Sequence, residues 1–171
     1  MPDSVTMANY NISFSGQVEN PGDNTQTWVY RIRKIGEPIP QINLWILVLC
    51  TDPKHHIISS TGAGTVEFGV CPTCFPGMTN TIMWKDLNNQ NINGLYSFTI
   101  KGLFEPADIP VFLSAGNTLN TALLPAPAVN LWNRIMSNSI FYNNSKVTGK
   151  LPIAFTTNYL CFGIFSLSFH P

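Results

Sequence analysis

The residues of this sequence best suited to chemistry are its cysteines, Cys50, Cys71, Cys74 and Cys161. Cys71 and Cys74 form a CxxC pair inside the segment GVCPTCFPG. Such pairs occur in zinc sites, in thiol–disulfide oxidoreductases and in disulfide frameworks. A zinc ribbon carries two such pairs, whereas the other two cysteines here stand alone. A redox pair opens a helix that lowers the thiol pKa, whereas Pro and Gly follow this one.

Disulfides therefore fit these cysteines best, because strand-and-loop proteins facing an oxidising exterior use them. The favoured pairing joins Cys50, at the end of one expected strand, to Cys71 or Cys74 at the end of another. Sequence alone leaves the connectivity open. Cys161 alternates with apolar residues, so we interpret it as a buried free thiol. A cysteine left unpaired could also reach a second copy of the chain. We expect no metal site and no cofactor.

No set of side chains indicates an enzyme. His55 and His56 are adjacent, and adjacent side chains on an extended segment diverge, so we expect both to be solvated. The nine acidic residues are scattered without the spacing of a glycosidase pair or a calcium loop. An acid, a base and a nucleophile that converge are absent from the pattern, so we predict a non-enzymatic protein.

The tryptophans raise the alternative of a carbohydrate-binding module, which would stack exposed aromatic rings on sugars. Trp28, Trp45 and Trp84 fall in phase with apolar neighbours, so we expect them in the core. Trp132 and Tyr142 are the candidates for ligand-facing aromatic residues.

The composition excludes several classes of partner. Charged residues make up 11% of the 171 residues, and nine basic residues balance nine acidic ones. A nucleic-acid binder or a polybasic membrane anchor needs a basic surface, so neither is expected. No stretch is long and apolar enough for membrane insertion, and no signal peptide is visible. A charge-poor surface with zero net charge favours self-association, and the alternative is a monomer kept soluble by its many Asn, Thr and Ser residues.

Period-two alternation of apolar and polar residues dominates the chain and predicts strands. Tyr10 to Ser15 and Thr27 to Lys34 flank the turn segment NPGDN and predict a hairpin. The run from Leu44 to Cys50 is apolar on both faces, which is typical of a central strand. Further strands are expected at 65–70, 80–86, 95–102, 108–116, 149–157 and 159–169. Residues 51–64 suggest a loop, 124–127 a connection between strands, and 128–136 a short helix.

This pattern predicts an all-β fold: a two-sheet antiparallel β-sandwich, jelly-roll-like, with about eight or nine strands and at most one short helix. We expect a flexible N-terminal segment over residues 1–8 and a single β-sandwich domain over residues 9–171.

Several segments together resemble a family of bacterial surface or spore-associated β-sandwich domains. They are YNISFSGQV, INLWILVLC, VEFGVCPTC, TIMWKD, LYSFTIKG and PVFLSAGNT. The resemblance covers about Tyr10 to Thr118, with its most specific points at Trp45 with Cys50, Cys71 with Cys74, and Ile82–Trp84–Lys85. The chain has NLW and SAG where the family has SHW and KAG. The resemblance implies a structural module displayed on the outside of a cell or spore, without catalytic residues.

The expected function is thus a structural subunit of a spore exterior layer, such as the exosporium, or of an appendage fibre. Such a subunit would assemble with copies of itself through strand edges or a donated terminal segment. We expect the N-terminal segment, residues 1–8, to be donated. The apolar segment from Tyr159 to Phe169 is expected to close the sandwich of its own chain.

Overall fold

The computed structural model describes residues 3–37, 41–49, 56–71 and 80–128. The described residues form ten strands and contain no helix. Consequently, no helix in this part of the chain could span a membrane.

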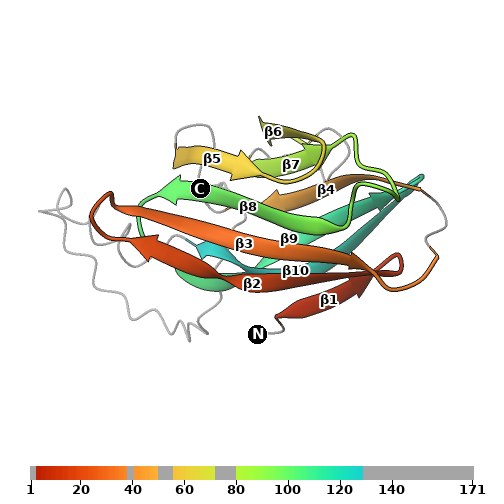
Figure 1. The fold of residues 1–171 in the computed structure, drawn as a ribbon, viewed down its shortest axis with the longest axis horizontal. Helices are drawn as coiled ribbons and strands as arrows, with labels where there is room; N and C mark the ends of the chain where they lie inside the picture. The colour runs from red at the N-terminus through yellow and green to blue at the C-terminus, as the bar shows by residue number, and fades with distance from the viewer. Residues whose placement is uncertain (1–2, 38–40, 50–55, 72–79, 129–171) are drawn as a thin grey trace, which may run out of the picture.

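The strands form two antiparallel sheets of five strands each (Figure 1). The first sheet has the order β1 (Ser4–Met7), β2 (Tyr10–Asn20), β3 (Thr25–Lys34), β8 (Gly94–Lys101), β5 (Ile57–Thr61). The second sheet has the order β10 (Thr118–Ala128), β9 (Glu105–Ala115), β4 (Ile42–Val48), β7 (Thr81–Lys85), β6 (Thr65–Gly69). β1 lies at one long side of the molecule, and β5 and β6 lie at the opposite side (Figure 1).

The two-sheet β-sandwich predicted from the alternation pattern is confirmed. β2 and β3 form the predicted hairpin, and β4 lies in the middle of its sheet. The described residues alone form ten strands, more than the eight or nine expected for the whole chain. Three of them were not expected. β1 lies in the segment 1–8 that we expected to be flexible, and β5 lies in the expected loop 51–64. β10 includes residues 124–127, which we expected to connect two strands. The helix expected at 128–136 and the strands expected after it lie outside the described residues, except that Ala128 ends β10.

The core lies between the sheets and is rich in aromatic rings. In the first sheet, alternate residues of β2, β3 and β8 point inward, and none of these side chains is solvent-exposed: Tyr10, Ile12, Trp28, Tyr30, Ile32, Tyr96, Phe98 and Ile100. The ring of Trp45 on β4 meets this layer, with its centroid 5.5 Å from that of Tyr30 and 5.2 Å from that of Tyr96. These contacts fix which face of β4 is turned to the core.

The second sheet also buries its opposite face. Ile46 follows Trp45 in β4, so it points away from the first sheet. Its register partners on the neighbouring strands are Met83 of β7 and Phe112 of β9. Ile46, Met83 and Phe112 are 0%, 3% and 2% exposed, respectively. A strand apolar on both faces therefore corresponds to a sheet buried on both faces, as the sequence of β4 predicted.

Four prolines lie in the β9–β10 ribbon, and their positions follow one rule. Pro106 of β9 is the register partner of Pro127 of β10. Neither proline has an N–H group, so this pair cannot be one of the hydrogen-bonded pairs of the ladder. Because the two kinds of pair alternate, Pro110 and Pro125 also fall in non-hydrogen-bonded pairs. Every proline nitrogen thus faces away from the ladder, where its missing N–H breaks no bond between these strands.

A glycine corner carries the chain from the first sheet to the second between β5 and β6. Gly64 has φ of 76°, in the left-handed region that favours glycine. A Cβ atom at this position would stand 1.9 Å from the carbonyl oxygen of Lys85. The corner can therefore approach β7 only because residue 64 has no side chain.

Candidate functional site

Most of the residues singled out in the sequence lie outside the described part of the chain. These are Cys50, Cys74, Cys161, His55, Trp132 and Tyr142. Their predicted roles in disulfides, as a buried thiol and as ligand-facing aromatics stay predictions. Among the described residues, no group of three or more His, Cys, Asp or Glu side chains could hold a metal ion.

Cys71 is the cysteine that the structure describes. It follows β6, is 3% exposed, and belongs to the hydrophobic core. It is disulfide-bonded, and the described residues include no free cysteine. Its bonding partner lies outside the described residues, so the pairing with Cys50 remains a prediction.

Three of the tryptophans are core residues, as predicted. Trp28, Trp45 and Trp84 are each 0% exposed, so none of them can stack on a sugar ring in solvent. The indole N–H of Trp84 donates to the carbonyl oxygen of Thr61 at 3.0 Å, whereas that of Trp45 is buried without a hydrogen-bond acceptor. This aromatic cluster supports the fold rather than a ligand site.

A buried amide joins the other end of the core to a loop. Gln26 of β3 is 0% exposed. Its side-chain oxygen accepts from the indole N–H of Trp28 and from the backbone N–H of Phe104, each at 3.0 Å. Its side-chain nitrogen donates to the carbonyl oxygen of Phe104 at 3.1 Å. Because both ends of the amide are paired, Gln26 stabilises the β8–β9 connection instead of offering free groups to a ligand.

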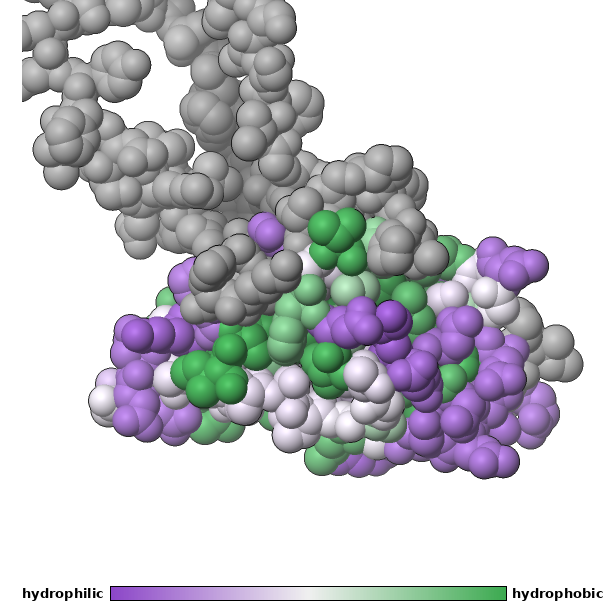
Figure 2. Space-filling view, turned by 90° about the horizontal axis from the view of Figure 1, so that it is seen from above, coloured by the Kyte–Doolittle hydropathy of each residue, from purple (hydrophilic) through white to green (hydrophobic). Residues whose placement is uncertain are grey.

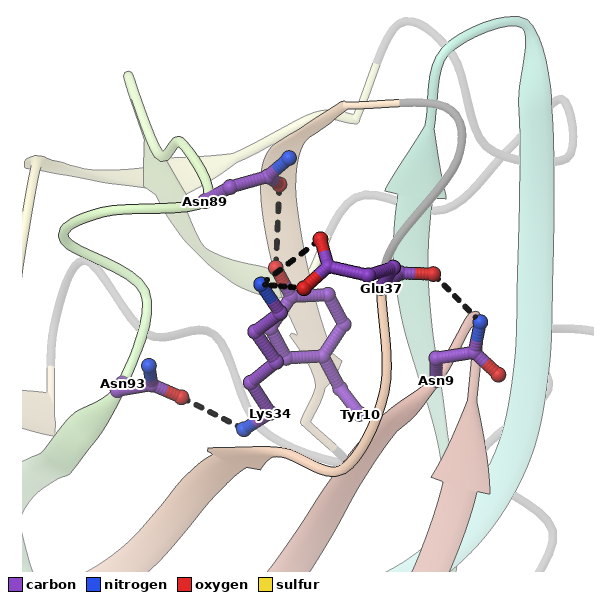
Figure 3. Close-up of polar contacts among 6 residues, drawn as sticks. All are labelled: Asn9, Tyr10, Lys34, Glu37, Asn89 and Asn93. Carbon is purple, nitrogen blue, oxygen red and sulfur yellow. Dashed lines mark hydrogen bonds and ion pairs between the residues drawn. The ribbon is translucent and has the colours of Figure 1, made fainter.

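A polar cluster occupies the end of the sandwich where the β1–β2 turn, the end of β3 and the β7–β8 connection meet (Figure 3). We define the polar cluster by the six residues Asn9, Tyr10, Lys34, Glu37, Asn89 and Asn93. The Tyr10 hydroxyl donates to Oδ1 of Asn89 at 3.1 Å, and the backbone N–H of Lys34 donates to Oδ1 of Asn93 at 2.6 Å. Residues about 60 to 80 positions apart in the sequence are joined in this way.

Glu37 connects the cluster to the β1–β2 turn. Nδ2 of Asn9 donates to the backbone carbonyl of Glu37 at 2.8 Å, and the Lys34 ammonium lies 3.2 Å from its carboxylate (Figure 3). The Glu37 side chain is 87% exposed, so the ion pair contributes little to stability. Burial raises the pKa of Tyr10, and the carboxylate of Glu37 raises it further. Tyr10 therefore stays a neutral hydrogen-bond donor at physiological pH.

The polar cluster has a structural role, because its hydrogen bonds join connections that are far apart in the sequence. It holds amides, a phenol and one exposed ion pair, but no thiol or imidazole that could serve as a nucleophile or a base near neutral pH. The composition of the Asn-rich segment LNNQNING, residues 87–94, indicates only a turn. No local signal links Asn89 and Asn93 to Tyr10 and Lys34, because the sandwich fold alone brings them together.

The free edges of the sheets are the other candidate sites, because an edge strand presents unpaired N–H and C=O groups. β1 lies against β10 at one side of the molecule. β5 contains a register shift between Ile57 and Ser59, an irregularity that hinders further pairing. β6 pairs with β7 in unbroken register and has neither proline nor lysine. Among the described edges, β6 is thus the least protected.

Compared with protein-family models and with curated proteins, the chain matches none.

Proposed function

We propose that this chain is a non-enzymatic structural protein that assembles with copies of itself, as a subunit of a spore exterior layer or of an appendage fibre. The observation that carries this proposal is that β6, among the described strands, lies at the edge of the second sheet. The strand can accept an antiparallel strand from a second copy, which would extend the second sheet across two molecules.

The residue that follows β6 strengthens this argument. Val70 is 63% exposed, the largest exposure among the large hydrophobic residues of the described chain. Ile58 of the neighbouring edge strand β5 is 59% exposed. Seen from above in Figure 2, hydrophobic residues lie across the middle of the molecule and hydrophilic ones gather toward its ends. Pairing at β6 would remove some of this apolar surface from water.

Three further features support an assembled protein at an exterior location. The chain is charge-poor with zero net charge, which suits a protein that ends in an assembly. A disulfide at Cys71 is typical of an oxidising environment. The resemblance to spore-associated β-sandwich domains points the same way. Assembly by strand pairing between copies requires neither a ligand nor a cofactor.

The test is the oligomeric state of the purified chain, measured by size-exclusion chromatography with light scattering and by electron microscopy. We expect discrete oligomers or fibres. Val70→Lys should weaken them, because a lysine beside an edge strand opposes strand pairing. Leu103→Lys is the matched control: Leu103 is 48% exposed but lies in the β8–β9 connection.

Two results would overturn the proposal. The first is a chain that stays monomeric at every concentration. The second is oligomers that respond equally to Val70→Lys and Leu103→Lys. A monomer that binds a glycan array would favour the carbohydrate-binding module instead, with Trp132 and Tyr142 as its candidate contacts.

A further inference from the structure

The turn between β1 and β2 has an unusual backbone for its residues. Ala8 and Asn9 connect the two strands as a two-residue loop, and their φ angles are 48° and 63°. A two-residue hairpin turn of this kind needs left-handed backbone at both positions, for which Asn-Gly or Gly-Gly is preferred. Asn tolerates this region, whereas the Cβ of Ala is crowded against the backbone. The turn is therefore strained at Ala8.

Two hydrogen bonds hold the turn in place despite this strain. The backbone N–H of Ile35 donates to the carbonyl oxygen of Asn9 at 2.9 Å. Nδ2 of Asn9 donates to the carbonyl of Glu37, as part of the polar cluster (Figure 3). Both bonds act on Asn9, so outside the closing pair Met7–Tyr10 the turn is held through Asn9 rather than through the strained Ala8.

β1 is a four-residue edge strand, and a backbone hydrogen bond of 2.7 Å from the Phe14 N–H to the Asp3 carbonyl extends its ladder. Its ladder to β2 pairs Ser4 with Ser13 through Met7 with Tyr10. Met7 is the one fully buried side chain of β1, and Val5 is partly buried against the core. On its other side β1 lies against β10. When β1 leaves, the edge of β2 from Tyr10 to Ser13 becomes free to pair with the same sequence from elsewhere.

We propose that β1 is exchanged between copies of this chain, so that β1 of one molecule pairs with β2 of another in the register seen here. The inference rests on the proposed self-assembly and names the segment that carries it. The closed and exchanged forms make the same β1–β2 contacts and differ in the turn. In the exchanged form Ala8 becomes extended, which removes its strain, while Asn9 loses its two bonds. Exchange into successive molecules forms a chain of subunits.

An engineered disulfide can report this exchange. Ser4 and Ser13 are register partners in a non-hydrogen-bonded pair, because the closing pair Met7–Tyr10 of the hairpin is hydrogen-bonded and pairs alternate. Side chains in such a pair are close enough for a disulfide. The Ser4→Cys and Ser13→Cys single variants are mixed, refolded together and oxidised. Peptide mapping then shows whether the two substituted positions are linked between chains.

We expect a link between chains for this mixture and none for a mixture of Ser4→Cys with Ser59→Cys, whose substituted position lies on the far edge strand β5. Ala8→Gly relieves the strain in the closed turn and should lower the yield of the linked species several-fold. An unchanged yield with Ala8→Gly would show that the turn does not drive exchange and would overturn the inference.

The results also separate this inference from the proposed function. If the chain forms oligomers but the mixture gives no link between positions 4 and 13, exchange of β1 is wrong and assembly through another edge stands. If the chain is monomeric and gives no link, both proposals fail. In the double variant Ser4→Cys/Ser13→Cys, a link within one chain that leaves oligomers intact would likewise overturn exchange.

Discussion

The indole rings of Trp45 and Trp84 stack on each other with their centroids 4.4 Å apart, on the neighbouring strands β4 and β7. Both side chains are fully buried, yet their N–H groups differ. That of Trp84 donates to the carbonyl of Thr61 and thereby attaches the end of β5 to the second sheet, whereas that of Trp45 has no acceptor.

This difference predicts unequal effects of the same substitution. Trp84→Phe removes a hydrogen bond, whereas Trp45→Phe removes a buried donor without a partner. Both leave a cavity of similar size, so the packing losses should largely cancel in the comparison. Trp84→Phe should therefore lower the free energy of unfolding by about 1 kcal/mol more than Trp45→Phe does. Urea denaturation measures the difference, and equal losses would contradict the assigned hydrogen bonds.

Gly64 provides a test of the corner between β5 and β6. Gly64→Ala places a Cβ against the Lys85 carbonyl oxygen and forces a left-handed backbone on alanine. We expect a loss of about 2 kcal/mol or more in the free energy of unfolding. Gly22→Ala is the control, because a Cβ at Gly22 meets nothing within 4 Å and its φ is not in the left-handed region. Thermal unfolding of the two variants should differ clearly.

Buried tyrosines predict a loss of stability at high pH. Burial raises the pKa of Tyr30 and Tyr96 well above the ordinary value of 10.0. Only the unfolded chain releases these protons near pH 10, so the stabilisation is complete below that pH and is lost as the pH rises beyond it. Absorbance of tyrosinate should therefore rise together with unfolding. Titration of all five tyrosines near pH 10 in a folded chain would contradict this burial.

Tyr30→Phe should separate the two contributions of that residue. The Tyr30 hydroxyl donates to the carbonyl oxygen of Pro125 at 2.9 Å, so the variant should lose about 1 kcal/mol at neutral pH. It should also lose less stability than the unsubstituted chain on going to alkaline pH, because one buried phenol is gone. Chemical denaturation at neutral and alkaline pH checks both effects.

The register of the second sheet sharpens the prediction for Cys71. Val48 of β4 and Gly69 of β6 are both register partners of Thr81 on the strand between them. Cys50 and Cys71 each come two residues later in the sequence, so both follow strands that end at the same edge of the sheet, and we predict that they pair. Non-reducing peptide mapping should recover a Cys50–Cys71 peptide. Reduction should cost about 3 kcal/mol, and a different partner for Cys71 would contradict the prediction.

Alternation in the sequence predicts the strands whose inner and outer faces differ. β2, β3 and β8 are of this kind, and β4 is recognisable because it is apolar on both faces. The strands that the pattern missed, β1, β5 and β10, all lie at edges, where the alternation weakens. β1 has four residues, β5 has adjacent isoleucines of which Ile58 is exposed, and β10 contains two prolines. Edge strands tolerate such residues because one side of the strand makes no ladder.

The polar cluster could not be predicted from sequence, for a different reason. Asn89 and Asn93 fall in the segment LNNQNING, whose composition indicates a turn, whereas Asn9 falls in the strand pattern that contains Tyr10. Their contacts, however, depend on how the two sheets and their connections meet. Local patterns carry no information on that arrangement. The core tryptophans were predictable because a large apolar residue in phase with other apolar residues has one physical explanation, burial.

The prolines of the β9–β10 ribbon have a consequence for stoichiometry. At Pro125 and Pro127 the outer side of β10 offers no N–H donor, and the Pro125 carbonyl is already occupied by Tyr30. This half of β10 therefore cannot template another strand. If copies meet at β6, the β6 edge of each second sheet is used up, so two copies joined edge to edge at β6 form a symmetric pair. Unlimited growth then requires a second, non-equivalent contact, and a filament built from this chain would be a string of pairs rather than an endless sheet.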